Sequence, residues 1–254
     1  VRLRIGDDLL ARMPRRAIAE DLLRNEQQWL PRLAPGLPLP IPAPLRTGRP
    51  DAAYPYVWSI LPWIQGEAAD LAPPDASEAP VLANFLRAVH QPAPADAPKN
   101  PVRDCPLSAK QADTERRMET LRRDTDAITP SIESIWARAL AAPIDLPRTW
   151  IAGDVHARNV LVRNGKLAAF IDWGDICAGD AATDLASIWS LFDAAPARQA
   201  ATKAYGMSQA TVARAMGWAV FYGVILLETG RMDTPRHAVM GEAILRRLSQ
   251  DAPI

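Results

Sequence analysis

The sequence predicts an α+β protein with two lobes, a small β-rich N-terminal lobe and a larger, mostly helical C-terminal lobe. Strand-forming segments dominate before residue 64, and amphipathic helical patterns dominate after residue 78. One strong hairpin signal interrupts the helical region near residue 164. A chain of 254 residues is long enough to bury a core in each lobe. We place the boundary where a β-rich segment ends at Pro62, which gives residues 1–63 and 64–254 as the two lobes.

Composition excludes several classes of protein. Hydrophobic residues make up 48% of the chain and charged residues 23%, as in ordinary soluble globular proteins. We expect no membrane partner, because no apolar run approaches the roughly 20 residues that cross a bilayer and the first residues, VRLRIGDD, lack the apolar core of a signal peptide. The 29 basic residues balance 29 acidic ones, which argues against a nucleic-acid partner. Two distant cysteines, Cys105 and Cys177, fit a reduced cytoplasm.

The N-terminal lobe is predicted to contain short strands and one helix. Residues 1–5 form a strand without a partner, and residues 9–13 form a second strand that Pro14 ends. A Pro-rich connector at 34–50 leads to an apolar strand within residues 56–64. Basic residues here are all arginines, since no lysine precedes Lys99.

Residues 19–33 are predicted to form the helix of this lobe. Leu22, Leu30 and Leu33 share one face by their spacing, and Pro31 kinks or ends the helix. Glu26 lies on the same apolar face, where a carboxylate is costly unless it is paired. It either reaches water at the edge of the stripe or has a partner.

The C-terminal lobe is predicted to be helical apart from its central hairpin. Helical patterns cover residues 78–92, 108–142 and, with short breaks, 183–254. The Asn164-Gly165 dipeptide favours a type I′ turn between two apolar runs. Folding about this turn pairs three sets of residues: Arg163 with Lys166, Leu161 with Ala168, and Asn159 with Phe170.

Polar residues gather at the open end of this hairpin. Asn159 and Asp172 lie there, and Asp154 precedes the first strand closely enough to curl back over them. An amide oxygen beside a carboxylate suits Mg²⁺, which prefers oxygen ligands and is often completed by phosphate. A third carboxylate could accept a proton from a substrate hydroxyl. The hairpin alone is equally compatible with polar residues that cap strand ends and face water.

Three ordered motifs extend this pattern: AGDVHARN (residues 152–159), IDWGD (171–175) and GDAATDLA (179–186). Together they resemble the catalytic segment of the aminoglycoside phosphotransferase family, with its protein-kinase-like fold. The resemblance covers essentially the whole chain from Ile5. It implies a phosphotransferase that moves the γ-phosphoryl group of ATP or GTP, with Mg²⁺, to a hydroxyl of an aminoglycoside-, macrolide- or metabolite-like molecule. Resistance to such antibiotics is one expected role.

The resemblance also implies a role for each matching residue. Asp154 is the catalytic aspartate, Asn159 and Asp172 bind the metal, and Asp184 supports the catalytic loop. Five N-terminal residues follow in the same way. Arg12 stands where the family has its nucleotide-phosphate lysine, and Glu26 is its partner. The hinge that faces the purine consists of Pro62, Trp63 and Ile64. We therefore expect Arg12 to contact Glu26 within about 4 Å and to point towards Asp172.

The chain departs from the family pattern at several positions. Ala152 replaces a supporting histidine, Trp173 replaces a phenylalanine, and the first strands of the N-terminal lobe are not in this sequence. A non-catalytic nucleotide- or ligand-binding relative is therefore the alternative function. A protein kinase fits the motifs less well.

Three histidines are too few for a metal-dependent phosphatase. We expect His90 to be structural, His156 to support the catalytic loop and His237 to face solvent. The identity of the acceptor is left open. Acidic residues of the C-terminal helices would suit a cationic sugar or would simply lie on a solvated helix face. These residues are Glu228, Asp233 and Glu242. The sequence says nothing about oligomeric state.

Overall fold

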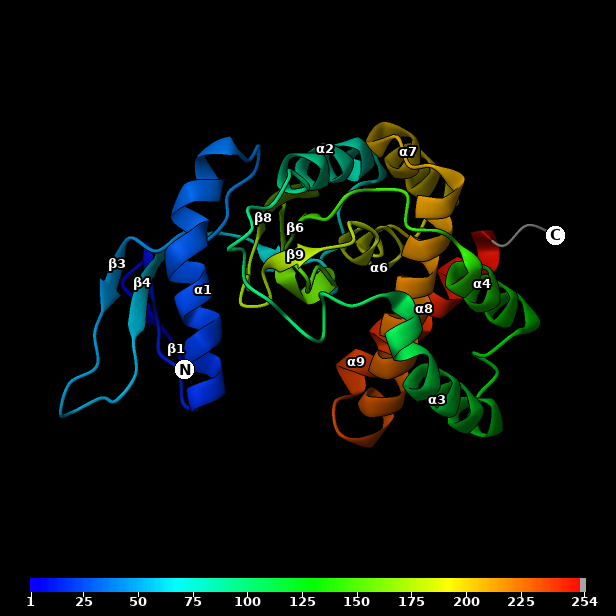
Figure 1. The fold of residues 1–254 in the computed structure, drawn as a ribbon, viewed down its shortest axis with the longest axis horizontal. Coiled ribbons are helices and arrows are strands. Elements are labelled where there is room, and N and C mark those ends of the chain that lie inside the picture. Colours follow the sequence, from blue (N-terminus) through cyan, green and yellow to red (C-terminus); the bar gives the residue numbers. More distant parts are fainter. Residues whose placement is uncertain (252–254) are drawn as a thin grey trace.

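The computed structural model describes residues 1–251 and confirms the α+β fold class. A small β-rich N-terminal part stands beside a larger helical C-terminal part (Figure 1). The strands are β1 (Arg2–Ile5), β2 (Leu9–Arg12), β3 (Arg46–Gly48), β4 (Trp58–Pro62), β5 (Glu67–Ala68), β6 (Thr149–Ile151), β7 (Val160–Arg163), β8 (Lys166–Phe170) and β9 (Cys177–Gly179). The α-helices are α1 (Ala17–Leu33), α2 (Ala79–Val89), α3 (Gln111–Asp124), α4 (Pro130–Ala141), α5 (Ala182–Leu185), α6 (Ser187–Leu191), α7 (Ala195–Tyr205), α8 (Gln209–Met232) and α9 (Pro235–Asp251). Short 3₁₀ turns occupy Ala34–Gly36, Ala76–Glu78, Leu107–Lys110 and Ala157–Asn159.

The N-terminal sheet is antiparallel, with the strand order β1-β2-β4-β3. The prediction that residues 1–5 lack a partner was wrong, because β1 pairs with β2 along its full length. A tight turn makes this possible, since Gly6 adopts φ +58° between the two strands. Arg2 of β1 lies directly opposite Arg12 of β2 in the register.

Helix α1 packs beside this sheet (Figure 1) and carries one charged residue on its inner face. Its fully buried apolar residues are Leu23, Trp29 and Leu30, and Glu26 is buried among them. The predicted stripe was therefore partly wrong, because Leu22 and Leu33 are only half-buried. The leucine pattern overlooked Trp29, whose large indole is also buried. The buried face of α1 is therefore centred differently from the predicted stripe.

The central hairpin has the predicted turn but not the predicted register throughout. Arg163 pairs with Lys166, and Asn164 and Gly165 both have positive φ, as a type I′ turn requires. Further from the turn the pairing shifts by one residue, which makes Ala168 an extra residue on β8. The predicted pairs Leu161–Ala168 and Asn159–Phe170 were consequently wrong. The structure pairs Leu161 with Ala169 and Val160 with Phe170.

Helix α8 forms the centre of the C-terminal part, where α3, α4, α5 and α9 pack against it. Close approach to α9 depends on small residues, since a Cβ atom on Gly241 would lie 2.4 Å from the backbone nitrogen of Leu227. Contrary to our expectation for this sequence, α8 is long and apolar enough to cross a membrane by length and composition. Most of it is nevertheless buried among the other helices.

Candidate active site

A tight backbone turn brings the catalytic-loop motif against the segment that follows the hairpin. Gly153, directly after β6, has φ +82°, and a Cβ atom there would lie 2.7 Å from the carbonyl oxygen of Asp175. Only glycine fits both the conformation and the space. At the other end of the loop, the Ile171 N–H donates to the Asn159 carbonyl at 2.8 Å. These two contacts hold the segment 153–159 against the segment 171–175.

Asp154 is held by three neighbours. Arg103 Nη2 donates to its Oδ1 at 2.6 Å, and Asn159 Nδ2 donates to its Oδ2 at 3.2 Å. His156 Nε2 lies 3.5 Å from the same Oδ2 atom. Burial raises the pKa of Asp154, but the hydrogen bond from His156 and the charge of Arg103 outweigh it and hold the pKa below its usual value. The carboxylate is therefore ionised at neutral pH and can accept a hydrogen bond from a hydroxyl.

The side chains of Asn159 and Asp172 have the right donor atoms for a magnesium ion. Asn159 Nδ2 also donates to the Asp154 carbonyl at 3.0 Å, which turns the amide oxygen away from Asp154. Asp172 adopts φ +62°, an unusual conformation for a residue with a side chain, and its carboxylate remains about one-third exposed. Two protein oxygens of this kind fit Mg²⁺, which usually takes its other ligands from water and phosphate.

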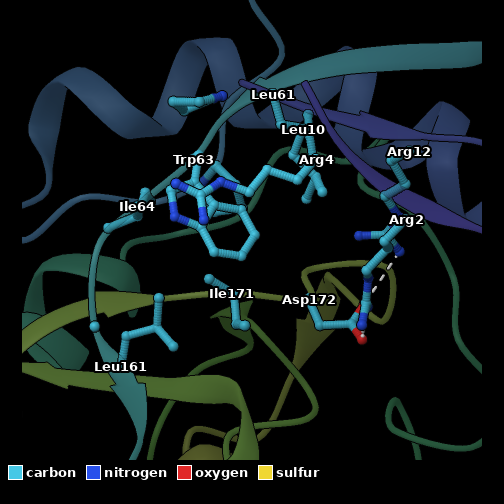
Figure 2. A pocket seen from close by; sticks show the side chains of 13 residues that line it. Arg2, Arg4, Leu10, Arg12, Leu61, Trp63, Ile64, Leu161, Ile171 and Asp172 are labelled. Carbon is cyan, nitrogen blue, oxygen red and sulfur yellow. Dashed lines mark hydrogen bonds and ion pairs between the residues drawn. The ribbon is translucent and has the colours of Figure 1, made fainter. Parts of the chain in front are cut away.

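Two arginines of the N-terminal sheet reach Asp172. Arg12 Nη2 donates to Oδ1 at 3.0 Å, and Arg2 Nη2 donates to Oδ2 at 2.5 Å (Figure 2). On its other side, Arg12 Nη1 donates to Glu26 Oε1 at 2.6 Å, as expected from the resemblance to the family. Burial of Glu26 outweighs the neighbouring charge of Arg12 and raises the pKa of Glu26 to about 7.

A cavity of about 460 Å³ lies between the N-terminal sheet and the hairpin. Pro62, Trp63 and Ile64 line it together with Leu161 and Ile171 on the opposite wall (Figure 2). The Trp63 N–H donates to the Asp8 carbonyl at 2.7 Å. Pro62 has no N–H because it is a proline. Of the three predicted hinge residues, Ile64 is therefore the one whose N–H is free to bind a ligand in the cavity.

Asp184 of α5 anchors the loop that the resemblance assigns to catalysis. Its buried carboxylate accepts the backbone N–H groups of Ala152 at 2.7 Å and Gly153 at 2.8 Å. His90 lies 3.3 Å from the same carboxylate and 2.8 Å from the Tyr205 hydroxyl, which confirms its structural position. The loop is thus fixed through its backbone, although Ala152 carries no polar side chain.

Sequence reasoning missed the residue that links most of this site. Arg103, from the Pro-rich loop before α3, contacts Asp154, Asp175 and the Tyr222 hydroxyl of α8. Asn100 Nδ2 donates to Asp175 from the same loop at 2.9 Å. Neither residue lies in a periodic pattern or a motif, so no local signal could have found them.

Two predictions about polar side chains of the C-terminal part were wrong. His237 does not face solvent, because it is half-buried and its Nε2 contacts Arg158. Glu228 is not part of a solvated helix face, since Arg117 binds it and its side chain is only 14% exposed. Asp233 and Glu242 are exposed, as a solvated face requires.

The comparisons with known proteins agree with this arrangement. The fold is similar to that of solved kinase-like phosphotransferases. The chain belongs to the phosphotransferase enzyme family, whose model matches residues 1–218. A search of proteins with curated functions found no significant match.

Solved structures of similar fold are aminoglycoside and macrolide phosphotransferases. The GDP and kanamycin complex of APH(2")-IIIa has a TM-score of 0.65 and 16% identity over 98% of this chain and 89% of that one. ADP-bound aminoglycoside phosphotransferase APH(2'')-Ib has a TM-score of 0.56 and 18% identity, over 98% and 92%. Macrolide 2'-phosphotransferase MphH from Brachybacterium faecium has a TM-score of 0.56 and 18% identity, over 94% and 85%. At these identities the similarity establishes the fold.

Proposed function

We propose that the protein transfers the γ-phosphoryl group of ATP or GTP to a hydroxyl group of a small molecule in a Mg²⁺-dependent reaction. The observation that carries this proposal is one hydrogen-bonded cluster below a cavity lined by arginines. Asp154 binds Asn159 at 3.2 Å, Ile171 binds the Asn159 carbonyl at 2.8 Å, and Asp172 follows directly. The candidate proton acceptor and the two candidate metal ligands therefore lie on two segments that are hydrogen-bonded to each other.

The nucleotide would lie between the two lobes that we propose at residues 1–63 and 64–254. Its purine would occupy the cavity against Trp63, with Ile64 offering a backbone N–H. Its phosphates would meet Arg12, which Glu26 holds in place at 2.6 Å. An arginine at this position offers a planar fork of donors that matches phosphate oxygens.

Catalysis would depend mainly on positioning and charge, as in phosphoryl transfer generally. Bound through Asn159 and Asp172, Mg²⁺ would neutralise charge on the phosphates. Asp154 would orient the acceptor hydroxyl and accept its proton at a carboxylate oxygen. Asn159 and Arg103 fix that carboxylate from two sides at 3.2 and 2.6 Å.

The acceptor is proposed only as a small molecule of the aminoglycoside, macrolide or hydroxylated-metabolite kind. The similar structures include an aminoglycoside enzyme bound to kanamycin and a macrolide enzyme. The alternative of a non-catalytic relative gains nothing from Ala152, because Asp184 supports the loop through backbone N–H groups instead.

The experiment that tests this function compares the wild type with Asp154→Asn and Asp172→Asn. Release of ADP or GDP is measured with ATP and with GTP against panels of aminoglycosides, macrolides and sugar alcohols, with and without Mg²⁺. We expect acceptor-dependent turnover that needs Mg²⁺. Asp154→Asn should lower the rate about 10²-fold or more while nucleotide binding persists.

Asp124→Asn serves as the matched control, because Asp124 is exposed at the end of α3. Its activity should equal that of the wild type. A wild-type protein that binds neither nucleotide in the presence of Mg²⁺ would contradict the proposal.

A further inference from the structure

Strand β1 has an inverted pattern of apolar and charged residues. Leu3 and Ile5 are about half exposed, whereas Arg2 and Arg4 line the cavity on the other face of the strand. A surface strand normally directs its apolar residues inwards and its charges to water. Arg4 is paired with Asp7 in the following turn at 3.1 Å, so Arg2 is the arginine of β1 whose carboxylate partner lies across the cavity.

The charge on this face is concentrated at one cross-strand pair. Arg2 lies directly opposite Arg12 in the β1–β2 register. Like charges placed opposite one another destabilise a sheet. In the structure Asp172 lies between them, with one carboxylate oxygen bonded to each guanidinium at 2.5 and 3.0 Å.

The two arginines differ in how they are held. Arg12 has a second carboxylate partner, since its other terminal nitrogen binds the buried Glu26 at 2.6 Å. Within residues 1–251, Asp172 is the sole carboxylate in contact with Arg2, whose side chain is 53% exposed. Movement of Arg12 would leave the buried Glu26 unpaired, whereas movement of Arg2 would not.

A metal ion at Asp172 would displace Arg2. Mg²⁺ binds carboxylate oxygens at about 2.0–2.1 Å and would compete with the guanidinium for the Asp172 carboxylate. The doubly charged ion would also repel the arginine. Polyphosphate oxygens entering with the metal offer a replacement, because guanidinium groups bind phosphate through two parallel hydrogen bonds.

We propose that Arg2 is a polyphosphate-binding residue, which forms a two-arginine clamp with Arg12 on the nucleotide donor and pairs with Asp172 when the cleft is empty. This inference rests on the proposed function, because it assigns Arg2 to the same donor site. The ligand it recognises is the polyphosphate chain, whatever the purine.

Binding measurements on the whole chain test the proposal. Isothermal titration calorimetry is carried out on the wild type, Arg2→Gln and Arg2→Lys, with Mg²⁺ and non-hydrolysable analogues of ATP and GTP. Inorganic tripolyphosphate with Mg²⁺ reports on phosphate alone, and adenosine and guanosine report on the purine alone. Arg46→Gln is the matched control, because Arg46 pairs with Ile60 on the opposite face of the same sheet.

We expect Arg2→Gln to lose about tenfold or more in affinity for the triphosphate analogues and tripolyphosphate, since it loses a charge-assisted hydrogen bond. Nucleoside affinity should not change, Arg2→Lys should recover part of the loss, and Arg46→Gln should match the wild type. Arg2→Lys also retains the charge if the glutamine variant folds poorly.

Two outcomes overturn the role of Arg2 alone: triphosphate affinity in Arg2→Gln equal to that of the wild type, or equal losses for nucleosides and triphosphates. A wild-type protein that binds no triphosphate analogue overturns the proposed function together with this inference.

Discussion

Arg103 joins Asp154 to Asp175, the two carboxylates on either side of the tight contact at Gly153. One terminal nitrogen donates to Asp154 at 2.6 Å and to Asp175 at 3.1 Å, and the Arg103 side chain is only 14% exposed. The guanidinium also stacks near the Tyr222 ring at 5.5 Å. A residue from a loop thus fixes the geometry and the charge of the proposed catalytic aspartate.

Replacing Arg103 should change both the rate and its pH dependence. In Arg103→Gln the positive charge beside Asp154 is lost, so the pKa of Asp154 rises. We expect kcat to fall about tenfold, less than the roughly 10²–10⁴-fold contribution of a group that transfers the proton itself, and the acidic limb of the kcat/KM profile to move to higher pH.

The check is to measure the rate of Arg103→Gln across the acidic pH range and to compare it with the rates of the wild type and of Arg123→Gln. Arg123 is an exposed residue of α3. An acidic limb at the wild-type pH would show that Arg103 does not set the charge state of Asp154.

The two proposed metal ligands should contribute unequally. Asp172→Ala removes a charged oxygen ligand, whereas Asn159→Ala removes a neutral one. We expect Mg²⁺-dependent nucleotide binding to be lost more completely in Asp172→Ala. Titrations with a nucleotide analogue at several Mg²⁺ concentrations measure this, with Asp96→Ala in an exposed loop as the control. Wild-type affinity in both variants would place the metal elsewhere.

Glu26 should make the stability of the protein depend on pH. Its pKa is about 7 in the folded state against an ordinary value of 4.5, so folding favours its protonated form. Its contribution to stability is therefore fully present below pH 4.5 and is lost as the pH rises through 7. Relative to Glu26→Gln, the free energy of unfolding of the wild type should fall by about 3 kcal/mol over that range.

Urea unfolding of both proteins at a series of pH values, without nucleotide, measures this difference. Parallel curves for the two proteins would mean that Glu26 has an ordinary pKa in the folded state.

Asp184 should matter for both stability and catalysis. It is fully buried and accepts two backbone N–H groups, whereas an asparagine in its place would offer one oxygen and turn its NH₂ group towards a donor. We expect Asp184→Asn to destabilise the fold by about 3 kcal/mol, the usual cost of disrupting a buried charged network.

The kcat of Asp184→Asn should also fall, because the backbone before Asp154 loses its anchor. Urea unfolding and kcat are compared with those of Asp233→Asn, an exposed control. Unchanged kcat in a destabilised variant would separate Asp184 from the catalytic loop.

Features encoded by neighbouring residues were predictable from the sequence. The Asn164-Gly165 turn fixed the hairpin, and the spacing from Asp154 to Asn159 placed both side chains at its open end. The carboxylate on the apolar stripe of α1 left open whether Glu26 is paired, and the resemblance to the family supplied Arg12 as its partner.

Features set by distant packing were not predictable. Arg103 reaches Asp154 across 51 positions of the chain from a loop without periodicity. The extra residue Ala168 shifts the hairpin register although the turn itself is regular. The buried face of α1 includes Trp29, because its ring packs against that of Trp150 with 4.8 Å between the ring centroids.

Trp173 bears on how the protein is regulated. Its indole is 1% exposed, donates to the Phe170 carbonyl at 2.9 Å and meets the Phe85 ring edge to face. In protein kinases the aromatic residue after the metal-binding aspartate sets the active or inactive state by its packing. Swinging the Trp173 indole out would expose about 200 Å² of ring surface and break its hydrogen bond, at a cost of several kcal/mol. We therefore expect the segment to stay in a single position, without a switch of the kind that protein kinases have there.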